Sequence, residues 1–346
     1  VEREIEEEIV EPIEVVDKTE EKSAEWYYVE NNDSKGAFTL EEMKELIESN
    51  KITGSTLVWK ASLKDWQKLE DSASDITLAQ AKELNVDMIS LNVTFEGKTY
   101  KEEKDISKEE FFDLLVSSPS FPITSQPSPS ELMEILEEAK KNNDEVIGIF
   151  LSSKISGTYD NAVMIKNMVE IDNCHFIDSL SCSCGERYLV NEACRMRDEG
   201  VSYIDIVTTL EELKTRVRVM AGADNLDYLA KGGRVNAVAH KVGNLLKFKP
   251  LVTLDDEGKV SLFSKPRGTK SAIEELVLKL VNERLDERFP ICALYTPSIG
   301  NVLKLVEKLA NVGVEIHEFN KHMIGAVIGS HLGPNSFGLA YVVKKK

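Results

Sequence analysis

The sequence predicts an α/β protein preceded by a small α+β module, and two features of the chain lead to this fold class. From about residue 71 onward, β-rich runs alternate with amphipathic helical stretches, a pattern typical of layered α/β domains. Before that point, residues 25–70 contain all three tryptophans of the protein in a compact strand, turn, helix and strand pattern. With 346 residues, the chain is long enough for both parts.

The first 24 residues are expected to form an acidic linker. Residues 1–25 carry eleven acidic side chains against Arg3, Lys18 and Lys22, which accounts for −8 of the net charge of −18. Like charges at this density favour a solvated segment over a packed one. No basic stripe that could bind phosphates is visible elsewhere in the sequence, which argues against nucleic-acid binding.

The composition indicates a soluble protein with reduced thiols. No run approaches the ~18–20 apolar residues that span a bilayer, and the five cysteines are an odd number, which suggests a cytoplasmic protein. Cys182 and Cys184 are close neighbours in the sequence and Cys194 follows, but a second pair at zinc-ligand spacing is missing. We therefore expect buried, unreactive thiols, no metal site and no cofactor.

The segment 25–70 is expected to begin with a strand from Trp26 to Val29 and a turn over residues 32–36. Thr39 and Glu42 have the spacing of a capping box, which predicts the start of a helix of about ten residues. A second strand is expected over residues 56–60.

This segment resembles the bacterial GYF-like module in its W-Y-Y start, its G-x-F-T-x-E-E-M middle and its T-L-V-W…W end. Eukaryotic GYF relatives bind proline-rich peptides on an aromatic face. The resemblance implies such a surface at Trp26, Tyr28, Trp59 and Trp66, although the usual Gly-Pro of the middle motif is Gly36-Ala37 here. From the residues alone, these aromatic side chains could equally fill the small core of the module.

Hydroxyl-bearing side chains gather in the stretch "FPITSQPSPSEL", residues 121–132. Ser128 as N-cap, Pro129 as the first helical residue and Glu131 closing a capping box explain its second half. Thr124, Ser125 and Gln126 remain, just before a helix N-terminus whose free N–H groups and dipole favour an anion.

A second hydroxyl-rich loop follows an expected buried strand over residues 145–151. Ser153, Ser156 and Gly157 lie between that strand and a helix that begins near Thr158. Ligands of open α/β sheets bind at such carboxyl ends of strands, and Gly157 allows a close approach to the backbone. Helix capping by Ser156 or Thr158 is compatible with this function.

Two charged or titratable residues stand near glycines further along the chain. Arg234 follows Gly232-Gly233, which is expected to end a helix, and can present its guanidinium to an acidic group. His331 follows a short apolar run that we interpret as a strand, and precedes Gly333.

These residues also allow an enzymatic interpretation. Ser153 or Ser156 with His331 as base would make a small hydrolase or acyl transferase. The segment lacks the G-x-S-x-G elbow of hydrolases, and the sequence has no Walker A, H-E-x-x-H or dinucleotide motif. Hydroxyls without an activated nucleophile favour binding over bond breaking. A third interpretation is a scaffold in which the aromatic module is the functional part.

Taken together, the motifs resemble the DegV family. They are "DSASDIT", "TSQPSPSEL", "SSKISGTYDNA", "IDS", "LDYLAKGGRV", "LLKFKPLVTLDDEGKV" and "GSHLGPNSFG", in the family's order over residues 69–346. The resemblance implies two α/β domains, here about 71–225 and 226–346, with a ligand channel between them. It also implies a bound long-chain fatty acid, such as palmitate or oleate, that is presented to a separate fatty-acid kinase, with no catalysis by the protein itself.

The resemblance implies the head-group site as well. A threonine of the T-S-Q motif and the serine of the S-G-T motif bind the fatty-acid carboxylate in this family, and these positions match Thr124 and Ser156. The arginine of G-G-R and the histidine of G-x-H match Arg234 and His331, which we expect to balance the charge. Supporting positions in the same loops are Ser125, Ser153, Gly157 and Gly233.

Two stretches depart from the family pattern. The family begins with an apolar strand before D-S-x-x-D, whereas "WQKLE" stands there in this chain, so the first strand is either degenerate and shared with the module or lost. The family also commonly has a histidine in the strand that corresponds to residues 292–301, where Tyr295 and Thr296 stand here. We expect both departures to affect docking to a fatty-acid kinase more than lipid binding.

Overall fold

The structure is a computed structural model of the chain. It describes residues 26–30, 33–49, 51, 58–60, 66–223, 226–234 and 248–345. The chain divides into two compact units, the N-terminal module Val1–Lys64 and the body Asp65–Lys346. The acidic linker expected at residues 1–24 lies outside the described residues.

The N-terminal module contains a three-stranded antiparallel sheet of order β2-β1-β3 and one helix. Its elements are β1 (Trp26–Glu30), β2 (Asp33–Phe38), α1 (Leu40–Glu48) and β3 (Val58–Lys60). The capping box is confirmed, because Glu42 N donates to Thr39 Oγ1 (3.3 Å) and Thr39 N donates to Glu42 Oε2 (2.7 Å). The turn expected over residues 32–36 is wrong in extent, since β2 begins at Asp33 and its pairing with β1 orders most of that stretch.

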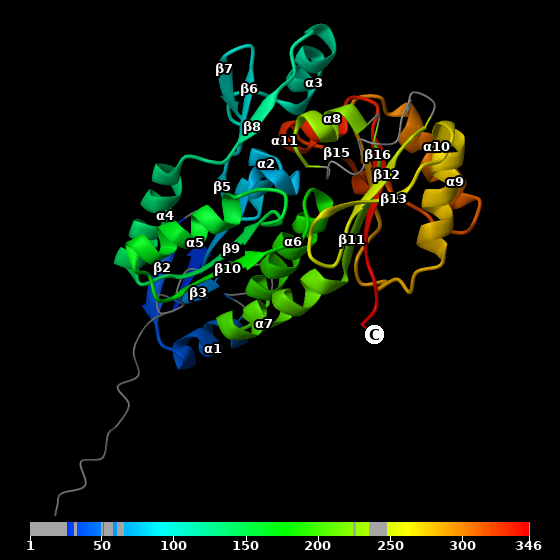
Figure 1. Cartoon of the computed structure of the whole chain (residues 1–346). Helices are drawn as coiled ribbons and strands as arrows, with labels where there is room; N and C mark the ends of the chain where they lie inside the picture. The colour runs from blue at the N-terminus through cyan, green and yellow to red at the C-terminus, as the bar shows by residue number, and fades with distance from the viewer. Residues whose placement is uncertain are drawn as a thin grey trace, which may run out of the picture. The chain divides into compact units, whose positions relative to one another are not determined.

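The first large sheet of the body has four parallel strands in the order β10-β9-β4-β5. These strands are β4 (Trp66–Asp71), β5 (Asp87–Ile89), β9 (Glu145–Phe150) and β10 (Cys174–Asp178). The associated helices are α2 (Leu78–Glu83), α4 (Pro129–Asn142), α5 (Thr158–Val169), α6 (Cys184–Asp198) and α7 (Tyr203–Leu213), as Figure 1 shows.

Alternate residues of β9 face opposite layers of helices. Val146 and Phe150 pack with residues of α4 and α5, while Ile147 and Ile149 belong to a core that includes residues of α6 and α7. This alternation is what a two-residue strand period produces when helices cover both faces of a parallel sheet. The strands expected over residues 145–151 and 173–179 are thereby confirmed within a residue or two.

The degenerate first strand is present. The strand β4 lies between β9 and β5, with Trp66 opposite Glu145 and Asp71 opposite Ile89. Because this strand belongs to the sheet of the body, the expected boundary at residues 70/71 falls inside an element, and the body begins earlier. Trp66 therefore belongs to the four-stranded sheet of the body and not to the three-stranded sheet of the module.

A polar strand in the middle of a parallel sheet has an electrostatic cost. Lys68 is 3% exposed and Glu70 is fully buried. Burial lowers the pKa of Lys68 to about 8 and raises the pKa of Glu70 to about 8, because both charged forms lose solvation. Neither Lys68 Nζ nor the Glu70 carboxylate oxygens have a hydrogen-bond partner among the described residues.

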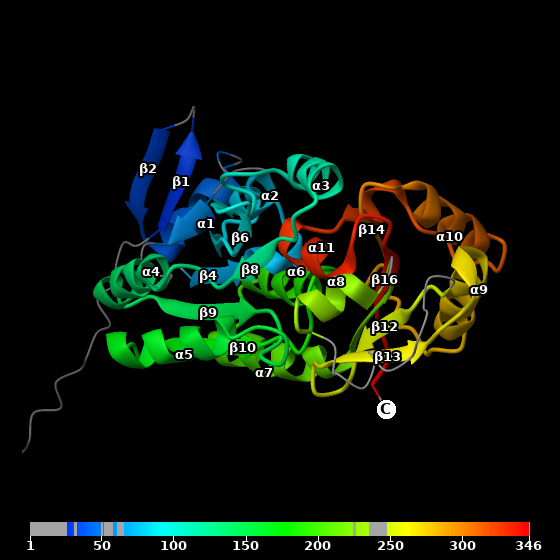
Figure 2. The same ribbon diagram turned by 45° about the horizontal axis from the view of Figure 1, so that its top comes forward.

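The second large sheet has the order β13-β12-β11-β16-β14-β15 and is antiparallel except for the parallel pair β14–β15. Its strands are β11 (Val217–Gly222), β12 (Leu251–Leu254), β13 (Val260–Ser264), β14 (Cys292–Tyr295), β15 (Lys321–Met323) and β16 (Phe337–Val342). Two helices, α9 (Gly268–Val281) and α10 (Gly300–Ala310), pack together against one of its faces (Figure 2). The other face joins the core that contains residues of α6 and α7.

Smaller elements complete the part of the body that bears on the site. The antiparallel sheet β7-β6-β8 comprises β6 (Asn92–Phe95), β7 (Lys98–Lys101) and β8 (Ile123–Ser125), and α3 (Lys108–Ser117) lies between β7 and β8 in the chain. The short helices α8 (Leu226–Lys231) and α11 (Ala326–Leu332) pack on each other. Among the described residues, none of the helices has the length and apolar character needed to cross a membrane.

Two further local expectations were wrong. The apolar run before His331 forms the helix α11, because a short apolar run has no period that separates strand from helix. At the start of α4, Ser128 is the N-cap and Pro129 the first helical residue, but the capping box does not form. Glu131 instead pairs with Lys101 (3.1 Å) and with Lys104.

Candidate functional site

A cavity of about 660 Å³ lies in the body and has two kinds of lining. Most of its wall is apolar and comes from the six-stranded sheet, from α8 and α11, and from the segments that follow β5 and β9. These apolar residues are Leu91, Leu151, Ile155, Val219, Ala221, Leu229, Val252, Leu254, Val260, Leu294, Ile324, Val327, Ile328 and Leu332. The size falls within the range of about 300–1,000 Å³ that is typical of small-molecule pockets.

One part of the cavity wall carries a polar pair. Thr124, in β8, and His331, in α11, are joined by a hydrogen bond of 3.0 Å between Thr124 Oγ1 and His331 Nε2. The other ring nitrogen, Nδ1, is buried and has no hydrogen-bond partner among the described residues. This nitrogen is packed against Gly232, where an added Cβ would lie 2.0 Å from it, so Nε2 is the ring nitrogen that bonds to the polar wall.

The imidazole of His331 is held neutral. Burial lowers its pKa to about 4, and the nearby Arg234 guanidinium acts in the same direction. At neutral pH, His331 therefore contributes its hydrogen bond to Thr124 rather than a positive charge. The sequence led us to expect that His331 and Arg234 would both balance the charge of a bound carboxylate. Because His331 is neutral, Arg234 is the cation of this pair.

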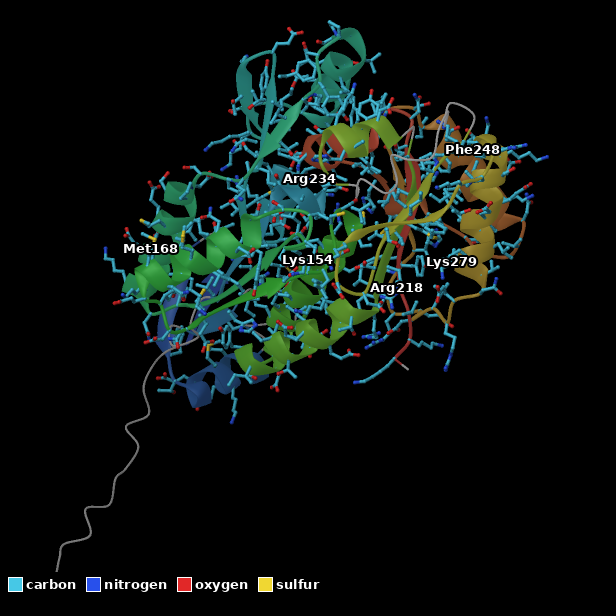
Figure 3. The ribbon with its side chains drawn as sticks, in the orientation of Figure 1. Lys154, Met168, Arg218, Arg234, Phe248 and Lys279 are labelled. Carbon is cyan, nitrogen blue, oxygen red and sulfur yellow. The ribbon has the colours of Figure 1, made fainter. Side chains whose placement is uncertain are left out.

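Arg234 reaches the cavity from the end of α8. Gly233 has a φ of +73°, so a glycine there ends the helix and turns the chain toward the site, as expected. Arg234 Nε donates to the Ile155 carbonyl oxygen (3.1 Å) and Nη1 to the Gly232 carbonyl oxygen (2.5 Å). These contacts hold Arg234 beside the loop that carries Lys154 (Figure 3).

The loop after β9 contributes a hydroxyl and a helix N-terminus. Ser156 Oγ lies 2.8 Å from Thr158 Oγ1 and accepts a hydrogen bond from Thr158 N (3.3 Å), so it is positioned at the first residue of α5. Gly157 is the N-cap of this helix, and a Cβ there would lie 2.4 Å from Gln126 Nε2. The absence of a side chain at Gly157 thus lets the two hydroxyl-rich loops approach each other.

The structure brings six of the eight expected head-group positions into the wall of one cavity. They are Thr124, Ser125, Ser156, Gly157, Arg234 and His331. Ser153 and Gly233 are not among the lining residues; Ser153 N instead donates to Asp178 Oδ1 (3.1 Å). Gln126, which the sequence singles out beside Thr124 and Ser125, also lines the cavity, whereas the sequence interpretation missed Asn161 as a lining residue.

Buried carboxylates position the helix that carries His331. Asp75 Oδ1 accepts a hydrogen bond from Gly325 N (2.7 Å), and Glu102 Oε1 accepts one from Val327 N (2.9 Å). Both carboxylates thus occupy the N-terminus of α11, where the free N–H groups favour an acceptor. Asp75 and Glu102 are each almost fully buried, and burial raises the pKa of Glu102 to about 7. This gives the second aspartate of D-S-x-x-D a physical role in the site.

The serine–histidine pairs that an enzyme would require do not form. His331 Nε2 binds Thr124, whereas Ser156 binds Thr158. Among the described residues, His331 Nδ1 also lacks the acidic partner that orients a catalytic base. The arrangement supplies donors and an apolar wall, which suit binding.

The expected peptide-binding positions are placed only in outline. Trp26 and Tyr28 belong to β1, Trp59 to β3 and Trp66 to β4. Their side chains lie outside the described residues.

Two protein-family models match the chain. The model described as "Uncharacterised protein, DegV family" matches residues 69–344, and the model "GYF domain 2" matches residues 26–73. The two matches overlap at residues 69–73, in the end of β4 and the short 3-10 helix Ser72–Ser74 that follows it, which agrees with a first strand shared by both sequence patterns.

Relatives and solved structures cover the same region. A DegV domain-containing protein of Caldanaerobacter subterraneus is 36% identical over 274 residues, which are 79% of this chain and 97% of that protein. The crystal structure of DegV from Bacillus subtilis, described as a fatty acid binding protein, superposes with a TM-score of 0.70 at 31% identity, covering 81% of this chain and 100% of the other. A fatty-acid-binding DegV family protein from Thermus thermophilus gives a TM-score of 0.71 at 29% identity, with 80% and 99% coverage.

Proposed function

This chain belongs to the DegV family, and we propose that its cavity binds a long-chain fatty acid such as palmitate or oleate. The protein holds the acid for fatty-acid metabolism and performs no chemistry on it. The single observation that carries the proposal is the composition of the cavity wall, which is polar around Thr124 and His331 and apolar over most of the remainder.

The polar part of the wall suits a carboxylate. The Thr124 and Ser156 hydroxyls can donate to the two oxygens, and the Thr124 proton is available for this when Nε2–H of neutral His331 donates to Thr124 Oγ1. Arg234 supplies the positive charge that a buried carboxylate needs. The N-terminus of α5 beside Ser156 adds free N–H groups that favour an anion.

The apolar part of the wall suits an alkyl chain. Burial of each methylene contributes about 0.8 kcal/mol, so most of the affinity comes from the chain and the carboxylate mainly fixes the orientation. Branched side chains of α11, namely Val327, Ile328 and Leu332, line the cavity on the helix that also carries His331. One helix therefore contributes to both the polar and the apolar part of the wall.

We also propose that the protein delivers the bound acid to a second protein. Ser125 and Gln126 line the cavity and are exposed, so the carboxylate would lie close to the surface. A head group in this position is accessible to a second protein, such as the fatty-acid kinase that the family resemblance implies. The DegV family member of Bacillus subtilis is described as fatty acid binding, which supports the ligand and leaves the kinase as a proposal for this chain.

The proposal is tested by titrating delipidated full-length protein with palmitate, oleate and a C16 alcohol in a calorimeter. We expect both acids to bind and the alcohol to bind more weakly, because it cannot use Arg234. Equal affinity for acid and alcohol would contradict the carboxylate site, and no binding of any of the three would contradict the carrier function. Release of p-nitrophenol from an acyl ester, abolished by Ser156→Ala, would instead support the hydrolase.

A further inference from the structure

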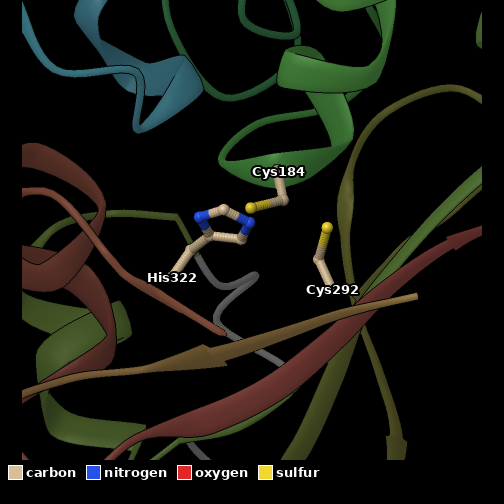
Figure 4. Close-up of side chains that lie close together, drawn as sticks. All are labelled: Cys184, Cys292 and His322. Carbon is tan, nitrogen blue, oxygen red and sulfur yellow. The ribbon is translucent and has the colours of Figure 1, made fainter. Parts of the chain in front are cut away.

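Three potential metal ligands meet away from the proposed lipid site. Cys184 is the first residue of α6, Cys292 opens β14 and His322 lies in β15. The two Sγ atoms and a ring nitrogen of His322 all lie within 4.8 Å of one another. The three side chains point toward a common centre, as Figure 4 shows.

The fold fixes the relative positions of these ligands. The strands β14 and β15 are adjacent and parallel, with Leu294 opposite His322, so Cys292 and His322 come from neighbouring strands. Tyr188, one helical turn after Cys184, places its hydroxyl 2.5 Å from the Pro290 carbonyl oxygen and 2.8 Å from that of Ala340. Since Ala340 pairs with Cys292 across the sheet, Tyr188 ties α6 to the strand that carries the second thiol.

The ligand set suits a soft divalent ion. Zinc binds thiolate sulfur at about 2.3 Å and imidazole nitrogen at about 2.0–2.1 Å in tetrahedral geometry, which places neighbouring ligand atoms about 3.5–3.8 Å apart. The ligand atoms of this site lie within 4.8 Å of one another, and rotations about χ1 of the two cysteines can bring them to these shorter distances. The charge of the ion would offset the two thiolates in a site where Cys184 is fully buried and Cys292 is 4% exposed.

A fourth ligand position is available on one side. Cys292 and His322 both line a second cavity of about 660 Å³, which is distinct from the lipid cavity and also includes Arg288 and Asn320. Three protein ligands with water or a substrate in the fourth position also occur in catalytic zinc sites, whereas structural zinc sites have four protein ligands.

We propose that Cys184, Cys292 and His322 form a binding site for Zn²⁺ or a similar soft divalent ion, whose fourth position opens into the second cavity. This departs from the expectation of no metal site. The spacing of Cys182, Cys184 and Cys194 gave no zinc pattern because the other two ligands come from strands far along the chain.

The test is a titration of reduced, chelator-treated full-length protein with Co²⁺. We expect one ion per chain, with a thiolate-to-cobalt charge-transfer band and the visible bands of tetrahedral cobalt, both abolished when Zn²⁺ is added. Cys184→Ser, Cys292→Ser and His322→Ala should each lose the bands. Cys194→Ser removes another buried thiol of α6 and should keep them.

Zinc X-ray absorption of the loaded wild-type protein provides a measurement that does not depend on variant folding. We expect two sulfur neighbours and one nitrogen neighbour from the protein, and an oxygen-only environment would overturn the proposal. So would the absence of cobalt bands in the reduced wild type, or their equal loss in Cys194→Ser. The Thr124→Ala/Ser156→Ala variant should retain the bands, so this result is independent of lipid binding.

Discussion

Thr124 Oγ1 lies 3.0 Å from His331 Nε2, although the two residues are 207 positions apart in the chain. This contact joins the small sheet that carries β8 to α11 across the polar part of the cavity wall. When Nε2–H donates to Thr124 Oγ1, the Thr124 hydroxyl proton is available to a ligand. We infer that this pair orients the carboxylate of the bound acid.

Removing the two hydroxyls should weaken binding of fatty acids. Hydrogen bonds to a charged group contribute about 1.5–3 kcal/mol each, so Thr124→Ala or Ser156→Ala should lower palmitate affinity by about tenfold or more. Displacement of a fluorescent fatty acid measures the effect. Ser130→Ala is the matched control, because Ser130 is exposed in the same hydroxyl-rich stretch but does not line the cavity, and an equal loss there would argue against the assignment.

The space around His331 predicts a second effect. A Cβ on Gly232 would lie 2.0 Å from His331 Nδ1, so Gly232→Ala should displace the ring and weaken the Thr124 contact. We expect about a tenfold lower affinity for palmitate with the protein still folded. Gly300→Ala places its Cβ in open space and serves as the control. Unchanged binding in Gly232→Ala would show that the ring orientation is unimportant.

The buried carboxyl of Glu70 should make stability depend on pH. Burial raises its pKa to about 8, above the value of 4.5 expected in the unfolded chain. Above pH 4.5 the unfolded state gives up this proton more readily than the folded state, so its contribution to stability falls until about pH 8.

The variant Glu70→Gln removes this titration. We expect it to raise the free energy of unfolding by about 1–4 kcal/mol at pH 8.5 and by clearly less at pH 5. Urea denaturation at the two pH values provides the measurement, and Glu83→Gln, at an exposed position of α2, is the control. A gain of equal size at both pH values would contradict the buried, protonated state of Glu70.

The N-terminal module should act independently of the body. If its aromatic residues bind proline-rich peptides, Trp59→Ala should weaken binding of such a peptide to the full chain while leaving palmitate affinity unchanged. Fluorescence polarisation with a labelled peptide and the lipid displacement assay together separate the two functions. A wild-type protein that binds no proline-rich peptide would leave the aromatic residues as core residues of the module.

Much of the architecture could be predicted because local signals agreed with the final packing. The apolar face of α4 and the buried run of β9 each specify their own element. The strand β4 could not be recognised in the same way, because Lys68 and Glu70 replace apolar residues and only pairing with β9 and β5 makes the segment a strand.

The candidate site, like the fold, could be predicted from the sequence only in part. Thr124, Ser156, Arg234 and His331 lie in recognisable sequence motifs, and all four line one cavity. The apolar wall could not be predicted, since residues such as Val219 and Leu294 look like any core residue of a strand. The neutral state of His331 depends on burial that only the tertiary structure reveals.

The measurement that most directly tests the central claim is native mass spectrometry, followed by organic extraction, of the protein purified from cells. We predict a co-purifying long-chain fatty acid in the wild type that is lost in the Thr124→Ala/Ser156→Ala variant. A wild-type protein that arrives empty and also refuses palmitate and oleate when they are offered would contradict the fatty-acid carrier.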